Sequence, residues 1–208
     1  MSADILMLDY VYRHETHLAS QVIFTQPVGN GQVETYTWKQ AMDQARRMAA
    51  HLKAQNFEPG SRIAILSKNT AHFIMAELAI WMAGHTTVAI FPTESAETVK
   101  YVLDHSGASL LFVGKLDSWD QQASAVPPSL PCITLPLAPE SATRVYEGWD
   151  VVIARTPALT EQVTRQPDDL ALLMYTSGST GTPKGAMHSF KGITQVAEGI
   201  VAYQAAQL

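Results

Sequence analysis

Cysteine is nearly absent from this 208-residue sequence, which contains only Cys132. A single cysteine cannot form an intramolecular disulfide, and it cannot supply the clustered thiolates of a structural zinc site. Because disulfide-poor sequences are typical of reducing compartments, we expect a cytoplasmic protein.

Long apolar runs and a basic leader are also missing. The longest apolar stretch, around residues 73–83, is interrupted by Glu77 and is much shorter than the roughly 18 residues of a membrane span. The first ten residues contain two acidic side chains and no basic one, so they do not resemble a signal peptide. No transmembrane segment is expected, and peripheral association with a membrane stays open.

Positive charge is in deficit, since 14 Lys and Arg against 19 Asp and Glu give a formal net charge of -5 at pH 7. A nucleic-acid surface needs concentrated basic side chains, so no nucleic-acid partner is expected. The content of 47% hydrophobic and 16% charged residues is ordinary for a globular domain. His14 and His17 are three residues apart without a third ligand nearby, and we expect both to be surface side chains.

The first part of the chain predicts a helix followed by a hairpin. A short helix is expected within residues 4–20, with strands at 21–25 and 33–37. Between the strands, Gly29-Asn-Gly31 provides residues that tolerate the positive φ angles of a tight turn.

A second helix is expected to begin after Thr37. Thr37 and Gln40 have the spacing of a capping box, in which each side chain bonds the backbone N–H of the other. An apolar stripe continues to about residue 52, whereas Arg46, Arg47 and Lys53 lie mostly off it. We therefore expect these three basic residues to face solvent.

Further along, apolar strands alternate with amphipathic helices. Strands are expected at 62–66, 86–91 and 109–113, and helices at 70–83 and 95–105. Because parallel strands need crossover connections, the alternation predicts an α/β fold with a mostly parallel sheet and helices on both faces. Residues 116–168 are rich in proline and less regular, with short helices expected at 118–125 and 145–153 and a strand at 132–135.

The run Tyr175-Thr-Ser-Gly-Ser-Thr-Gly-Thr-Pro-Lys-Gly185 follows an apolar strand at 170–174 and precedes a sequence with helical spacing. A strand, a hydroxyl-rich glycine loop and a helix predict a phosphate-binding site. Pro183 before Lys184 and Gly185 after it break the Walker A pattern, so a P-loop NTPase is disfavoured. A surface turn of small residues is the plain alternative.

This run closely resembles the phosphate-binding signature of the adenylate-forming superfamily, which includes acyl-CoA synthetases, peptide-synthetase adenylation domains and luciferases. Other stretches resemble landmarks of the family's amino-terminal domain, namely Tyr36-Thr-Trp38, Pro59-Gly-Ser-Arg-Ile-Ala-Ile65, Ala83-Gly84 and Val102-Leu-Asp-His-Ser106. The overall pattern looks most similar to fatty-acyl-CoA synthetases. The resemblance implies that residues 1–208 are an amino-terminal part of the AMP-binding domain, with the rest of that domain and a carboxy-terminal domain outside this sequence.

The resemblance implies an ATP-dependent acid–thiol ligase. A carboxylic acid, expected to be a fatty acid, would attack the α-phosphate of ATP to give an acyl-adenylate and pyrophosphate. The thiol of CoA, or of a carrier protein's pantetheine, would then accept the acyl group. Mg²⁺ is expected as a cofactor with its ligands outside this chain, and the 208 residues alone are expected to be inactive.

The family signature implies nine phosphate-binding positions, which are Thr176, Ser177, Gly178, Ser179, Thr180, Gly181, Thr182, Lys184 and Gly185. The hydroxyl groups would donate hydrogen bonds to the β- and γ-phosphates, the glycines would permit close approach, and the lysine would add positive charge. No catalytic nucleophile, general base or metal ligand is assigned within the chain.

The signature departs from the family at two places. Ser179-Thr180 is commonly Thr-Thr, and Ser189-Phe190 is often Thr-His. The role of that histidine is not carried over to His188, which we expect at the start of the following helix. The alternative function, a non-catalytic module that keeps the loop only to bind a nucleotide or anion, stays open.

Overall fold

The structure is a computed structural model, and it describes residues 5–177 and 183–205. The helices are α1 (Met7–His17), α2 (Trp38–Ala54), α3 (Ala71–Met82), α4 (Ala96–Ser106), α5 (Trp119–Gln122), α6 (Glu140–Thr143), α7 (Trp149–Arg155) and α8 (Phe190–Ala205). The strands are β1 (Val22–Gly29), β2 (Gln32–Thr37), β3 (Arg62–Leu66), β4 (Thr86–Ile90), β5 (Ala108–Val113), β6 (Cys132–Thr134), β7 (Glu147–Gly148), β8 (Leu170–Ser177) and β9 (Pro183–Ser189).

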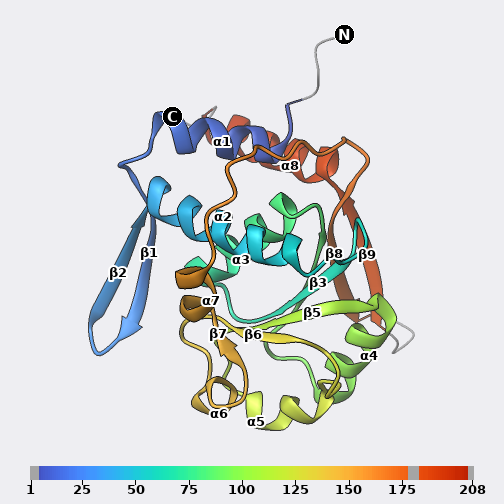
Figure 1. Ribbon diagram of the computed structural model, residues 1–208. Coiled ribbons are helices and arrows are strands. Elements are labelled where there is room, and N and C mark those ends of the chain that lie inside the picture. Colours follow the sequence, from blue (N-terminus) through green and yellow to red (C-terminus); the bar gives the residue numbers. More distant parts are fainter. Residues whose placement is uncertain (1–4, 178–182, 206–208) are drawn as a thin grey trace.

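A seven-stranded sheet lies at the centre, with the strand order β7-β6-β5-β3-β4-β8-β9. Every neighbouring pair is parallel except β8 and β9, which run antiparallel. β1 and β2 form a separate antiparallel hairpin that projects from the body at the left of Figure 1. The predicted α/β fold, with a mostly parallel sheet and an amino-terminal hairpin, is confirmed.

The two faces of the sheet carry separate hydrophobic clusters. Along β3, Ile63 and Ile65 belong to the cluster that contains α2 and α3, whereas Ala64 and Leu66 belong to the cluster that contains α4 and α5. This alternation follows from the two-residue repeat of a strand. In Figure 1, α2 and α3 lie above the strands and α5 and α6 below them, so helices cover both faces as expected.

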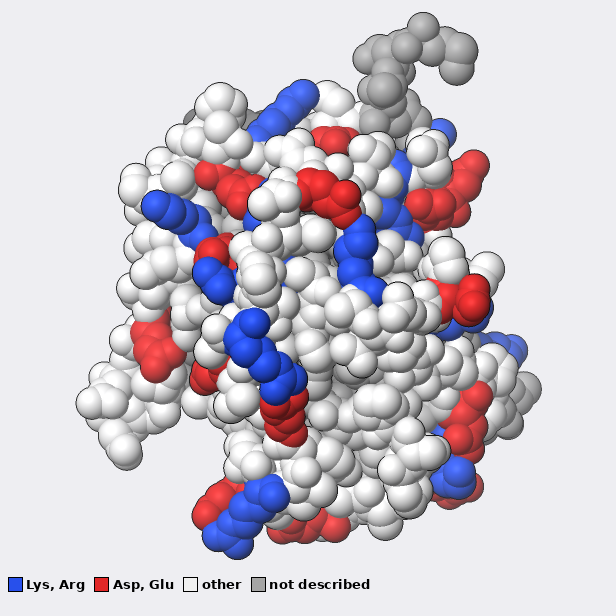
Figure 2. Space-filling view, in the orientation of Figure 1, with Lys and Arg blue, Asp and Glu red and all other residues white. Residues whose placement is uncertain are grey.

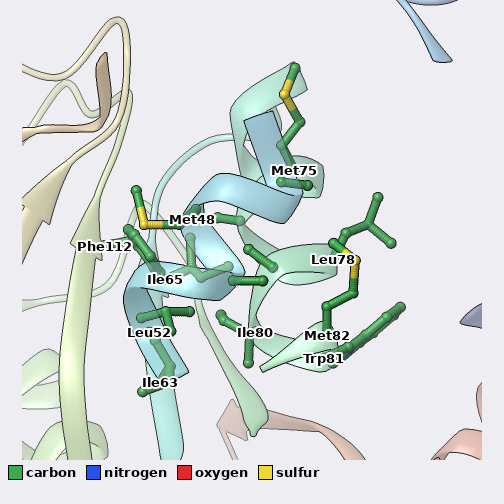
Figure 3. Close-up of a cluster of buried hydrophobic side chains, with 14 of the residues drawn as sticks. Met48, Leu52, Ile63, Ile65, Met75, Leu78, Ile80, Trp81, Met82 and Phe112 are labelled. Carbon is green, nitrogen blue, oxygen red and sulfur yellow. The ribbon is translucent and has the colours of Figure 1, made fainter. Parts of the chain in front are cut away.

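Figure 3 shows the cluster in which α2 packs on the sheet. Met48 and Leu52 from α2 lie near Ile63 and Ile65 from β3 and near Phe112 from β5, and all five side chains are fully buried. Burial of each such side chain contributes about 1.5–3 kcal/mol. This cluster packs β3 and β5 against α2, and it thereby helps to set where the carboxyl end of β3 lies.

The hairpin turn and the start of α2 agree with the sequence predictions. Gly29, Asn30 and Gly31 have φ angles of 103°, 51° and 73°. At the start of α2, the Gln40 N–H donates to the Thr37 hydroxyl at 3.3 Å and the Thr37 N–H donates to the Gln40 amide oxygen at 2.9 Å. Both orphan donors are therefore satisfied, and the capping box is confirmed.

Residues 116–168 contain more regular structure than the sequence predicts. α5, with a 3₁₀ turn at Ala123–Ala125, and β6 match the predicted short helix and strand. The helix predicted at 145–153 is observed as α7, which begins only at Trp149, because Glu147 and Gly148 form β7. Neither α6 nor β7 is predicted. These elements span four and two residues, which is too short to produce a periodic signal.

The prediction that Arg46 faces solvent is wrong. Its side chain is 9% exposed and donates to both carboxylate oxygens of Glu15 at 2.8 and 2.7 Å. It also donates to the backbone oxygens of Leu159 and Glu161, each at 3.0 Å. These partners come from α1 and from the segment before β8, so the helical pattern of α2 alone cannot reveal them. Lys53, in contrast, is exposed and pairs with Glu161.

Charged side chains of both signs are mixed over the surface. On the face of the described residues that Figure 2 shows, blue and red side chains often lie side by side and no basic patch forms. Among the described residues, no helix combines the length and apolar character that crossing the membrane would require.

Candidate functional site

The described parts of the signature run lie on two antiparallel strands, not on a strand followed by a helix. β8 leads into the run, and Pro183–Ser189 then return as β9, antiparallel to β8. The expectation of a helix directly after the loop is therefore wrong, because α8 begins only at Phe190. β9 pairs with the edge of β8 that β4 leaves free, and this tertiary pairing overrides the local helical spacing.

The prediction for His188 fails for the same reason. It lies on β9 opposite Leu172 of β8, not at the start of α8 as predicted. Its side chain is exposed. Since paired residues of an antiparallel ladder share a face, His188 is on the same sheet face as Leu172.

Five of the nine signature positions, Gly178, Ser179, Thr180, Gly181 and Thr182, lie outside the described residues. Ser177 ends β8 opposite Pro183. The remaining three are placed: Thr176 is opposite Lys184, and Gly185 is opposite Tyr175. Thr176, Lys184 and Gly185 are all exposed.

Thr176 and Lys184 share one face of the hairpin. Their direct pairing places both side chains on the same side of the ladder as Leu172 and Met174. A hydroxyl donor and an ammonium group are thus brought together next to the loop. This arrangement fits the polyphosphate of a nucleotide, because oxygen-rich anions accept hydrogen bonds from both groups.

A cavity of about 230 Å³ lies on the same face, between α3 and β8 at the carboxyl ends of β3 and β4. Its wall is mostly apolar and includes Phe73, Phe91, Leu172 and Met174. Ligands of open α/β sheets bind outside the carboxyl ends of the strands, so this edge is the expected place for a substrate.

One carboxyl group, that of Glu77, lines the cavity. The side chain is half-buried, and burial raises the pKa of Glu77 to about 7. From the sequence, Glu77 is notable only because it interrupts the apolar run at residues 73–83. Its place in an apolar cavity at a candidate ligand site is not predicted. Its location on α3 facing β8 depends on the tertiary packing.

The described residues contain no group of three or more His, Cys, Asp or Glu side chains that could hold a metal ion. No Mg²⁺ ligand is therefore assigned within that part of the chain. His14 packs against the Trp38 ring, with centroids 5.1 Å apart.

Residues 13–207 match the AMP-binding enzyme family. The chain belongs to this family. The resemblance inferred from the signature is confirmed by a match that covers nearly the whole chain.

Among the relatives of this AMP-binding chain are acyl-CoA ligases and peptide synthetases. It is 30% identical over 203 residues to the long-chain-fatty-acid–CoA ligase FadD15 of Mycobacterium bovis, covering 93% of the chain and 32% of that protein. It is 30% identical over 185 residues to the phosphinothricin tripeptide synthetase PhsC of Streptomyces viridochromogenes, covering 89% of the chain and 15% of that protein. The chain therefore spans a third or less of the length of these relatives.

Solved structures share the fold. The anthranilate CoA ligase AuaEII, in complex with anthranoyl-AMP, superposes with a TM-score of 0.77 at 21% identity, covering 90% of this chain and 36% of that one. A benzoate CoA ligase from Burkholderia xenovorans gives a TM-score of 0.74 at 21% identity, covering 93% and 36%. The fold of this AMP-binding chain is that of the amino-terminal region of such ligases.

Proposed function

We propose that this chain supplies the ATP-phosphate site of an enzyme that activates a carboxylic acid as its acyl-adenylate. The observation that carries the proposal is the family match over residues 13–207, combined with the hairpin that presents Thr176 and Lys184 on one face. The face lies at the carboxyl edge of the sheet beside an apolar cavity. In this proposal, the hydrogen-bond donors for phosphate lie next to the cavity that would hold the apolar part of the acid.

In the proposed reaction, a carboxylate oxygen of the acid forms a bond to the α-phosphorus of ATP, and the bond from that phosphorus to the bridging oxygen breaks. Pyrophosphate leaves with that electron pair. Its binding would fall to the signature, Thr176 through Gly185, whose hydroxyl groups, backbone N–H groups and lysine stabilise the negative charge of the leaving group. Mg²⁺ would screen the same phosphates, and it has no assigned ligand here.

The acid in this proposal is a fatty acid, and the acceptor of its acyl group is CoA. Support comes from the long-chain-fatty-acid–CoA ligases at 30% identity and from the apolar wall of the cavity. A peptide synthetase matches at the same identity, which favours a carrier-protein pantetheine as the second candidate acceptor. A cytoplasmic location, with the remainder of the AMP-binding domain in a longer polypeptide, is part of the same proposal.

The test is ATP–pyrophosphate exchange with hexadecanoate, octanoate, benzoate and amino acids, together with calorimetric titration of ATP. The 208-residue chain is expected to bind ATP without exchange, and the longest polypeptide that contains it is expected to exchange only when its acid is present. ATP hydrolysis without any acid would contradict acid activation. Binding without exchange in the longer polypeptide would favour the non-catalytic module.

A further inference from the structure

The distal part of the β8–β9 hairpin extends past the parallel sheet. The ladder between β4 and β8 consists of three pairs, the last of which joins Ala89 to Met174. Beyond Met174, Tyr175 and Thr176 are paired only with β9. The segment that carries the phosphate donors therefore needs an anchor other than the strand β4.

Tyr175 provides a contact on the opposite face of the hairpin. It is 5% exposed and lies opposite Gly185. A Cβ atom at position 185 would come within 3.2 Å of the Tyr175 ring, so a larger residue there would require the ring or β9 to shift by a few tenths of an ångström. The ring thus contacts both strands, next to Thr176 on one and Lys184 on the other.

The Tyr175 hydroxyl reaches α4. Its oxygen is 2.8 Å from Nδ1 of His105, in the last turn of that helix. The Tyr101 ring stacks on His105, with centroids 5.3 Å apart and planes 23° from parallel, and meets Tyr175 edge to face at 6.5 Å. Burial raises the pKa of Tyr175, so the phenol keeps its proton near pH 7, and its hydroxyl can pair with Nδ1 of either imidazole tautomer.

We propose that His105 is a positioning residue for phosphate binding. Through its hydrogen bond with Tyr175, it fixes the distal hairpin against α4 and so holds Thr176 and Lys184 at a constant position relative to the sheet. The inference rests on the proposed function, since it assigns His105 a part in the same site. His105 itself touches no phosphate and belongs to none of the nine signature positions.

The test uses the ATP dissociation constant of the 208-residue chain. His105→Phe keeps a ring to stack on Tyr101 but removes Nδ1, and Tyr175→Phe removes the hydroxyl that pairs with it. Each is expected to weaken ATP binding about 3- to 10-fold, the effect of one lost hydrogen bond, and the double variant no further than either single one. His105→Gln, which keeps an acceptor, is expected to recover part of the affinity.

The control is Tyr10→Phe, which removes an exposed tyrosine hydrogen bond of similar length, 2.7 Å from α1 to Glu198 of α8, and changes no residue of α4 or of the hairpin. It is expected to leave ATP binding unchanged. Affinity within twofold of the parent in His105→Phe, while Thr176→Ala weakens binding, would overturn the proposal.

Amide exchange separates positioning from general stability and does not depend on ATP. In Tyr175→Phe, the Thr176 and Lys184 amides are expected to exchange faster than in the parent, whereas the β3 amides are unchanged. A uniform change over β3 and the hairpin, or none at all, would overturn the proposal. If the parent binds no ATP, the proposed function fails, and the exchange result still decides whether His105 positions the hairpin.

Discussion

Lys184 supplies a positive charge to the proposed phosphate site. It is exposed, and the ladder places it directly opposite Thr176. A lysine ammonium acts on phosphate as a mobile point charge, whereas the adjacent hydroxyl donates a directed hydrogen bond. The two side chains are expected to contribute separately to nucleotide affinity.

Lys184→Ala is expected to weaken ATP binding by about 10-fold or more, because a charge-assisted hydrogen bond contributes about 1.5–3 kcal/mol. Lys184→Arg should retain part of the affinity. Calorimetric titration of ATP at low and high salt measures the effect, with Lys39→Ala, an exposed lysine on α2, as the control. An unchanged dissociation constant in Lys184→Ala would remove the role given to this lysine.

Glu77 predicts a pH dependence of stability. Its folded-state pKa of about 7 lies above the ordinary value of 4.5, so the folded chain disfavours the ionised carboxylate. The protonated Glu77 carboxyl therefore makes its full contribution to the free energy of unfolding below pH 4.5, and this contribution is lost as the pH rises through 7. Glu77→Gln should stabilise the chain relative to the parent at pH 8 by roughly 1–2 kcal/mol, and little at pH 4.5. Urea unfolding at both values checks this, with the exposed Glu97→Gln as the control.

At the scale of elements, Arg165 joins the structures that support the hairpin. Its guanidinium donates to the backbone oxygens of Trp81 and His85 at 3.2 and 3.0 Å, and to Asp169 at 3.0 Å. It also lies over the Phe190 ring, 4.6 Å from the centroid. The end of α3, the approach to β8 and the first residue of α8 thus meet at one buried cation.

Arg165→Met is expected to lower the free energy of unfolding by about 2–4 kcal/mol, because it removes the guanidinium donor from the backbone oxygens of Trp81 and His85 and breaks the ion pair with Asp169. Arg144→Met is the matched control, since the Arg144–Glu140 pair is exposed and should contribute less than 1 kcal/mol. Chemical denaturation of both variants makes the comparison. Equal effects in the two would contradict the role of Arg165 in joining these elements.

At the scale of the whole molecule, His72 lies where the β1–β2 hairpin, α2, α3 and α7 meet. Its Nε2 is 3.2 Å from the Gln44 amide oxygen, which also accepts from Trp149 Nε1 at 2.9 Å. The His72 ring contacts Tyr36 and Trp149 edge to face. Burial lowers the pKa of this imidazole to about 4, so the packed state holds it neutral.

The contribution of His72 to the free energy of unfolding is therefore expected to fall in acid. The contribution of neutral His72 is complete above its ordinary pKa of 6.5 and is lost as pH falls from 6.5 toward 4. Between pH 7 and pH 5 the parent should lose about 1–2 kcal/mol that His72→Gln does not lose. Urea denaturation at the two values measures this, with the exposed His17→Gln as the control. Parallel losses in the parent and His72→Gln would contradict the assignment.

The sequence by itself determined the elements whose signals are local. The alternation of β3, α3, β4, α4 and β5 is written in the spacing of apolar residues, and caps such as Thr37 and Ser95 lie within three residues of the groups they bond. The signature at 175–185 also identified the family, because its side chains and glycines are contiguous in the chain.

The tertiary structure decided everything that depends on partners distant in sequence. Pro183–Ser189 became β9 because the free edge of β8 pairs with them, and Arg46 became buried because Glu15 and two distant carbonyl groups meet it. Tyr175 and His105 are 70 positions apart, so no local pattern joins them. Spacing along the chain reports only on neighbours within a few residues. Burial, edge pairing and the positions of strand ends are set when the sheet and its helices assemble.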